Sequence, residues 1–367
     1  MGDERTVTGQ IGDLLRDSIW GNPWHRLEEG AEGLTDEDLE FQPVPGMIGA
    51  WGDPRGEPQI LKPLNMLQHV ISVAVDDGAG RLADRTEDPV EEEWDGLKDG
   101  GMPTAETLVR GVDVAHRLGL ARLATLTDDD LTRPDTAEPQ LWEGADLGSM
   151  AVQMLVLHAS WHFGQLAKLI TWRKELAERE AVLPKATITS VVPAMDRVPW
   201  SFPTVRTRQE LLVEVIRTAH SECPWHSLTR VLRDITEDEL TWKPFQPHAE
   251  MSGLPIWHLA FHVAACDVIY ADQAFGRRRD DWEWAHGIVG FRGHPWSPEE
   301  CLKGIALGAE FLMERVASAT DEQLDATYPM HHGTPLTGWQ VAATMVQHRL
   351  WHGAQICMIR EAKAALE

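Results

Sequence analysis

The chain has 367 residues, of which 43% are hydrophobic and 25% charged, a balance typical of globular rather than disordered proteins. Its formal net charge of −25 argues against nucleic-acid binding and against anionic membrane surfaces, because both need a basic face. No run approaches the roughly 20 apolar residues that span a bilayer, and the polar N-terminus has no signal-peptide pattern. We therefore expect a cytoplasmic protein whose four cysteines are buried apolar residues.

Each half of the chain is predicted to form four helices. In the first half, apolar residues recur at three- and four-residue spacing over residues 9–32, 63–85, 104–126 and 147–176. Thr104 and Ser297 stand where helices begin, the second followed by a proline at the first helical position. No alternating strand pattern of useful length occurs. The pattern predicts an all-α fold.

Matching segments in the two halves predict a tandem duplication. The segment PWHRLEEGAEGLTDEDLEFQP (23–43) resembles PWHSLTRVLRDITEDELTWKP (224–244), and LATLTDDDL (123–131) resembles VASATDEQL (316–324). We expect a four-helix bundle at residues 1–180, a linker at 181–205 and a second bundle at 206–367, related by a pseudo-twofold axis.

The motif His-x-x-x-His-x-x-Gln occurs once in each half. It contains His158 and His162 in the first half, and His348 and His352 in the second. Four residues are close to one helical turn, so both histidines of a pair lie on one face of their helix. A third histidine on the second helix of each half completes the pattern; it is His69 in the first half, and we pair it with His258 in the second.

Three imidazoles with an open position are typical of a catalytic divalent-metal site. All-nitrogen ligation favours zinc, nickel, iron or copper over magnesium or calcium. Core packing is the alternative for a single histidine, but packing alone does not require histidine at three matching places in both halves. We therefore predict metal ligation by six residues: His69, His158 and His162, and His258, His348 and His352.

Other repeated polar and aromatic residues are candidates for the surroundings of these sites. Gln165 and Gln355 share the face of the last histidine, where they are expected to orient it or to contact the ligand. Trp161 and Trp351 are expected to wall the site. His25 and His226, in Pro-Trp-His on the first predicted helix, either line the pocket or pack with the neighbouring tryptophans.

Several weaker candidates remain open. When the two halves are aligned so that His258 matches His69, His262 matches Val73. His262 is therefore either an extra ligand of the second copy or no ligand. Three aspartates near the ends of the second helices, Asp76, Asp77 and Asp267, either orient a histidine or are solvated, which we favour. The Gly/Pro-rich segment 44–60 is a candidate lid for the first site, and His331 and His332 lie in a predicted loop.

The histidine pattern and the segments WHFGQL (161–166) and WHGAQI (351–356) resemble the DinB/YfiT-like metalloenzyme superfamily. The Pro-Trp-His opening is similar to its second subfamily, which also forms the N-terminal domain of ergothioneine sulfoxide synthases. The resemblance implies antiparallel up-down-down-up bundles, with the six histidines as ligands. It also implies chemistry that uses a low-molecular-weight thiol, and either a homodimer or a monomer whose two copies form an internal pseudo-dimer.

Three functions follow as hypotheses. The first is a metal-dependent transferase or hydrolase that activates a thiol or water against a small-molecule substrate. The second is a metal- or small-molecule-binding module, such as a stress-response protein, without catalysis. The third is a binder whose histidines contact an anionic or aromatic ligand directly, with no metal. Metal identity, substrate and the activity of each site are not determined by the sequence.

Overall fold

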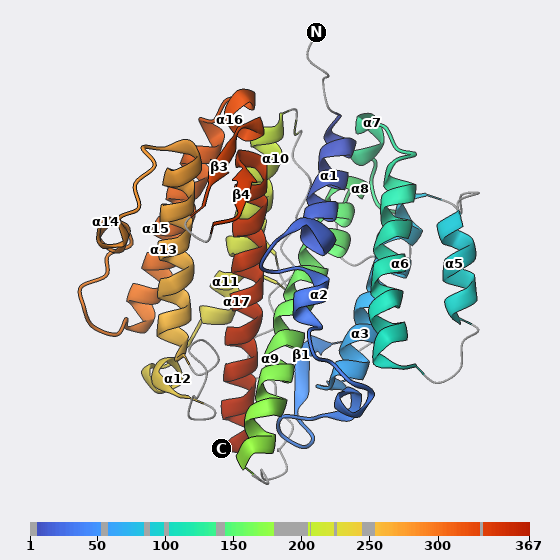
Figure 1. The fold of residues 1–367 in the computed structure, drawn as a ribbon, viewed down its shortest axis with the longest axis horizontal. Helices are drawn as coiled ribbons and strands as arrows, with labels where there is room; N and C mark the ends of the chain where they lie inside the picture. Colours follow the sequence, from blue (N-terminus) through green and yellow to red (C-terminus); the bar gives the residue numbers. More distant parts are fainter. Residues whose placement is uncertain are drawn as a thin grey trace.

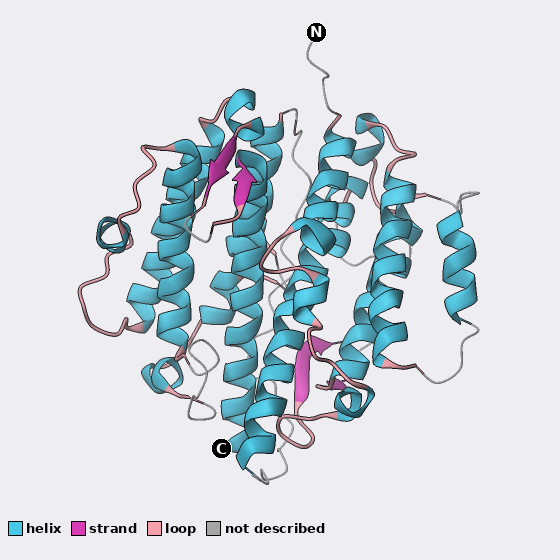
Figure 2. Ribbon diagram, viewed as in Figure 1, coloured by secondary structure: helices cyan, strands magenta, loops and turns pink. Residues whose placement is uncertain are grey.

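The structure of the chain is a computed structural model. It describes residues 6–52, 58–83, 89–98, 103–136, 144–179, 205, 207–223, 226–243, 254–330 and 333–367. Helices dominate these residues, and the short strands form two-stranded antiparallel pairs (Figure 2). The predicted all-α fold is confirmed. The predicted linker, 181–205, lies outside the described residues except for its last position.

The first half follows the predicted order of helices. Its elements are α1 (Val7–Arg16), η1 (Asp17–Gly21), α2 (Leu27–Gly30), η2 (Asp36–Glu40), β1 (Ile48–Gly52), β2 (Pro58–Ile60), α3 (Pro63–Ser72), η3 (Val73–Ala79), α4 (Gly80–Leu82), α5 (Pro89–Lys98), α6 (Ala105–Leu123), α7 (Asp128–Leu131), α8 (Leu147–Met150), η4 (Ala151–Leu157) and α9 (His158–Arg179). The four predicted helices correspond to α1 with η1, to α3 with η3 and α4, to α6, and to α8 with η4 and α9.

The second half repeats this arrangement. Its elements are α10 (Arg208–Arg217), η5 (Thr218–Glu222), α11 (Leu228–Leu232), α12 (Glu237–Thr241), α13 (Ile256–Phe275), α14 (Trp282–Ile288), α15 (Pro298–Ala317), α16 (Asp321–Asp325), β3 (Thr327–Pro329), β4 (Pro335–Thr337) and α17 (Gly338–Leu366). Its four long helices are α10 with η5, α13, α15 and α17.

Local sequence explains where the helices begin. The Thr104 side chain accepts a hydrogen bond from the backbone N–H of Thr107, which satisfies one of the free donors at the start of α6. Ser297 does the same for Glu300 at the start of α15, and Pro298 occupies the first helical position. Both predicted helix starts are confirmed.

The predicted helix over residues 9–32 is interrupted, and α2 (Leu27–Gly30) is a separate short helix. The helix ends at Gly21, and Asn22 is extended, with φ −72° and ψ 127°. The cause is Pro23, which has no N–H to continue the helix and forces its predecessor out of the helical region. His25 therefore lies in a bend after the helix, and His226 likewise follows η5 instead of lying on a helix.

The two halves pack through α9 and α17, which lie side by side in the middle of the molecule (Figure 1). A Cβ added to Gly164 of α9 would lie 2.6 Å from the carbonyl oxygen of Trp351 in α17. A Cβ added to Gly353 of α17 would lie 2.9 Å from Cζ3 of Trp161 in α9. Glycine at these two positions therefore permits the close approach of the helices.

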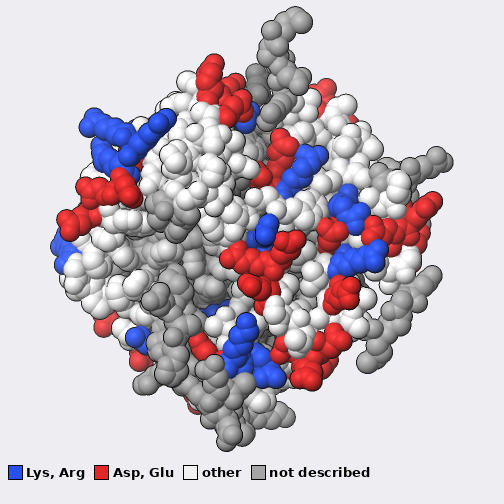
Figure 3. Space-filling model, in the orientation of Figure 1, with Lys and Arg blue, Asp and Glu red and all other residues white. Residues whose placement is uncertain are grey.

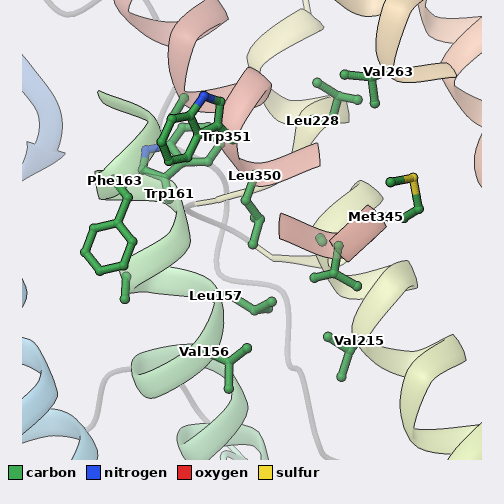
Figure 4. Close-up of a cluster of buried hydrophobic side chains, with 14 of the residues drawn as sticks. Val156, Leu157, Trp161, Phe163, Val215, Leu228, Val263, Met345, Leu350 and Trp351 are labelled. Carbon is green, nitrogen blue, oxygen red and sulfur yellow. The ribbon is translucent and has the colours of Figure 1, made fainter. Parts of the chain in front are cut away.

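Buried apolar side chains continue from one half into the other. Figure 4 shows part of this core, with Trp161 on α9 beside Trp351 on α17. The segment 44–60, the candidate lid, contains the antiparallel pair β1 and β2, and β1 lies against α17 of the other half. Residues 53–57 of the segment lie outside the described residues. Each half is therefore in contact with helices of the other near the repeated histidines.

Candidate metal centres

The first centre is formed by three histidines from two neighbouring helices. His69 is on α3, and His158 and His162 are one turn apart on α9. Nε2 of His158 lies 3.0 Å from Nε2 of His69 and 3.1 Å from Nε2 of His162. Nitrogens that share a tetrahedral zinc at 2.0–2.1 Å are about 3.3 Å apart. The three imidazoles therefore converge on one point that can hold a metal ion.

A glutamine orients the last histidine of each pair. Oε1 of Gln165 lies 2.6 Å from Nδ1 of His162, and Oε1 of Gln355 lies 2.8 Å from Nδ1 of His352. A carbonyl oxygen only accepts, so Nδ1 must be the protonated nitrogen that donates. This tautomer leaves the lone pair of Nε2 directed at the centre, as metal ligation requires.

The second centre contains His262 and not His258. Nε2 of His262 lies 3.1 Å from Nε2 of His348, and the His262 ring lies 5.1 Å from that of His352. The ring of His258 instead contacts Trp257 and Phe261, at centroid distances of 5.1 and 6.1 Å. The predicted pairing of His258 with His69 is therefore wrong by one helical turn.

The error has a simple geometric origin. His258 and His262 lie one turn apart on the same face of α13, so periodicity alone cannot choose between them. The height at which α13 packs against α17 decides, and it places His262 opposite His348. A signal was present in the sequence: His69-Val70 and His262-Val263 are 193 residues apart, the same offset as between residues 123–131 and 316–324.

A thiol also lies at the second centre. Sγ of Cys266, one turn after His262, is 3.7 Å from each ring nitrogen of that histidine. The ligand atoms of Cys266, His262 and His348 all lie within 4.8 Å of one another. At the 193-residue offset the first half has Val73 at this position. The two centres therefore differ in their donor atoms, which sequence analysis missed by treating the cysteines as packing residues.

Burial favours the neutral form of the paired histidines on α9 and α17. It is the main cause that lowers the pKa of His158 and His162 well below the usual value, and the neighbouring histidines lower it further. The same causes lower the pKa of His348 and His352. Neutral imidazole is the form that binds metals, so both histidine pairs are in the ligating form at neutral pH.

The family follows from a sequence comparison. A profile described as the DinB superfamily (DinB_2) matches the chain twice, over residues 22–166 and 224–356. The chain belongs to the DinB superfamily. Its two DinB copies each contain a histidine group described above, and the predicted tandem arrangement is confirmed. Comparisons with curated proteins and with solved structures gave no match.

Each DinB copy has a histidine in the bend after its first helix, His25 in the first copy and His226 in the second. Each of these two crossing histidines lies beside the candidate metal centre of the other copy. The ring of His226 is 5.1 Å from that of His158 and 5.7 Å from that of His162. The ring of His25 is 5.3 Å from that of His348 and 6.3 Å from that of His352. Each imidazole thus lies across the interface from the copy that contributes it.

The two tryptophans of the DinB signatures pack against these crossing histidines. The Trp161 ring lies 5.3 Å from that of His226, and the Trp351 ring lies 5.0 Å from that of His25. Both indoles are buried where α9 and α17 meet. The Trp24 ring, from the same Pro-Trp-His segment as His25, lies 5.9 Å from that of Tyr270 of the second copy.

The three aspartate candidates form hydrogen bonds or ion pairs with residues other than the histidines. Asp76 accepts a hydrogen bond from Ser72, and Asp77 forms an ion pair with Arg81. Asp267 is not solvated as expected; it is fully buried in an ion pair with Arg349. The other two candidates, His331 and His332, lie outside the described residues.

Proposed function

We propose that this DinB protein is a metal-dependent enzyme that activates water or a low-molecular-weight thiol for transfer to, or hydrolysis of, a small molecule. The observation that supports this proposal best is the convergence of Nε2 of His69, His158 and His162 at 3.0 and 3.1 Å. The group of His262, His348 and His352 offers the same arrangement in the second copy.

The donor set favours zinc, nickel or iron, because neutral imidazoles suit these cations better than magnesium or calcium. A bound cation of this kind would act as a Lewis acid and would lower the pKa of a coordinated water or thiol. The protein's own contribution is to hold the imidazoles in one tautomer through Gln165 and Gln355, and to exclude water with Trp161 and Trp351. A dry site strengthens electrostatic interactions with the reacting group.

A small-molecule substrate fits the charge of the protein. On the face shown in Figure 3, acidic side chains lie over both copies, between basic ones. With a net charge of −25, the absence of nucleic-acid partners remains our expectation. Among the described residues, no helix combines the length and the apolar character needed to cross a membrane.

A non-catalytic metal-binding module is the second candidate. The observation that favours it is the fourth imidazole beside each group, His226 at the first centre and His25 at the second. Structural zinc sites are closed by four protein ligands, whereas catalytic ones keep a position for water or substrate.

Metal content is the first test. We expect the purified protein to contain about two equivalents of transition metal, one for each three-ligand group. His162→Ala and His262→Ala should each remove about one equivalent. The matched control is His258→Ala, one turn before His262 on α13, which should leave the content unchanged. A chain that binds no zinc, nickel or iron when these are supplied would contradict the proposal.

A measurement of enzymatic activity distinguishes the metal-dependent enzyme from the non-catalytic module. The metal-loaded protein should transfer a thiol such as glutathione, mycothiol or bacillithiol to a model electrophile, or hydrolyse an activated ester, and a chelator should abolish the rate. Full metal occupancy without any such rate would favour the non-catalytic module. Small-molecule binding that survives chelation would instead support a direct contact of the histidines with the ligand.

A further inference from the structure

We propose that each metal centre is shared between the two DinB copies, with His226 as a fourth nitrogen ligand of the first centre and His25 as a fourth nitrogen ligand of the second. This inference rests on the proposed metal binding. It adds a ligand to each group that comes from the opposite half of the chain, and it makes the interface between the halves part of both centres.

Ring separations decide between ligation and a more distant role. Imidazoles that share a tetrahedral metal at 2.0–2.1 Å have ring centroids about 5 Å apart. Within the first group these separations are 4.9, 5.1 and 4.5 Å. His226 lies 5.1 and 5.7 Å from the rings of His158 and His162, so it fits the same shell.

The alternative is an imidazole that contacts a molecule bound to the metal instead of the metal itself. Inserting one such molecule, with a normal hydrogen bond, would place the fourth ring about 6 to 7 Å from the ligand rings. Both separations of His226 are shorter. For His25, the 5.3 Å separation from His348 fits ligation and the 6.3 Å separation from His352 falls at the lower end of the longer range. The ligand atom of His25 lies within 4.8 Å of those of His348 and His352.

The crossing histidines, His25 and His226, are both buried, and one ring nitrogen of each makes no hydrogen bond to the described residues. His25 is 9% exposed and His226 is 6% exposed. Among the described residues, Nδ1 of each has no hydrogen-bond partner. Buried polar atoms are rarely left without a partner, and each imidazole is placed against a group that can hold a cation.

The bends that hold these histidines are fastened to the opposite copy. The Asn22 side chain accepts hydrogen bonds from the backbone N–H groups of Trp24 and His25, and its amide donates to Gln347 on α17. In the second copy, Cys223 accepts from the backbone N–H of His226 at 3.0 Å and from Gln153 of the first copy at 2.7 Å. The reciprocal arrangement places each bend beside the other copy's centre.

A shared centre has a consequence for the proposed chemistry. Four nitrogens, three from one copy and one from the other, would then hold the cation, and the cation would supply Lewis-acid chemistry to a water or thiol that reaches it. Metal binding at one centre also ties the two copies together, because its ligands come from both. Occupied centres would therefore stabilise the α9–α17 interface as well as each bundle.

The test measures metal affinity at one centre at a time, in the full-length chain. His352→Ala disables the second centre and leaves the first as the measured site. In this background, His226→Gln keeps the volume and burial of the side chain but removes the imidazole. Competition with a chromophoric chelator gives the zinc affinity, and the visible spectrum of the cobalt(II)-substituted protein reports the coordination number. His286→Gln, a half-buried histidine outside both centres, is the matched control.

We expect His226→Gln to weaken zinc binding at least tenfold and to change the cobalt spectrum, while His286→Gln changes neither. The reciprocal experiment, His25→Gln in a His162→Ala background, should do the same for the second centre. Unchanged affinity and an unchanged spectrum in a folded His226→Gln protein would overturn the shared ligand and leave the three-histidine proposal intact. A wild-type chain that binds no metal would instead overturn the proposed function itself.

Discussion

The close approach of α9 and α17 at Gly164 predicts that adding a methyl group at this position destabilises the protein. Gly164 lies two residues after His162, and it faces the backbone of Trp351, which precedes His352. An added Cβ would lie 2.6 Å from the Trp351 carbonyl oxygen, 2.7 Å from its Cα and 3.0 Å from its carbonyl carbon. Backbone atoms cannot rotate away as a side chain can, so Gly164→Ala must push the two helices apart.

The expected change in the free energy of unfolding is the sum of two opposing effects. Overpacking a well-packed interface costs typically about 1 to 3 kcal/mol, whereas replacing glycine by alanine inside a helix gains about 1 kcal/mol. We expect Gly164→Ala to lower the free energy of unfolding by up to about 2 kcal/mol. It should also weaken metal binding at both centres, because the separated helices contain His162 and His352.

The matched control is Gly96→Ala. Gly96 lies exposed on α5, and its added Cβ would meet nothing within 4 Å. This control should gain stability by up to about 1 kcal/mol. Urea unfolding of the metal-free proteins, at matched pH and concentration, measures both changes. If Gly164→Ala were stabilised as much as Gly96→Ala, the packing argument would be refuted.

The remaining predictions concern single residues. Gln165→Ala should weaken metal binding at the first centre by about 10- to 100-fold without changing the stoichiometry, as a competition titration would show. Arg349→Met should lower the free energy of unfolding by about 3 to 5 kcal/mol, because it leaves Asp267 buried without its partner; an Arg349→Met/Asp267→Leu double variant that recovered none of the loss would contradict this. Burial lowers the pKa of His116 to about 4, so the unfolded chain takes up a proton near pH 6.5 that the folded chain does not. Stability is therefore fully present above pH 6.5 and falls towards pH 4, by up to about 3 kcal/mol for this group, and His116→Gln should remove that part of the pH dependence in urea unfolding. Chelation should lower the thermal midpoint of the metal-loaded protein, and an unchanged midpoint would count against metal binding to the folded state.

Much of the fold could be predicted because it depends on local patterns. The spacing of His158 and His162, and of His348 and His352, places each pair on one helix face whatever the helix packs against. The caps at Thr104 and Ser297 mark helix starts through contacts with residues three positions away. Such features need only a few neighbouring residues, so periodicity and residue type are sufficient to find them.

The prediction failed where distant segments decide the structure. His258 and His262 are equivalent on an isolated helix, and only the packing of α13 against α17 selects His262. The thiol of Cys266 joins the second group for the same reason. The burial of Asp267 depends on Arg349, which is 82 residues away along the chain. None of these contacts leaves a local periodic signature.

By itself, the order of residues determined a duplicated helical protein with paired histidines on one face of a helix in each copy, because helical periodicity and capping act over a few residues. Only the tertiary structure decided that His262 and not His258 joins the second pair, and that the bends containing His25 and His226 lie against the opposite copy. The physical reason is the α9–α17 interface, where Gly164 and Gly353 permit close packing that brings together residues nearly 200 positions apart.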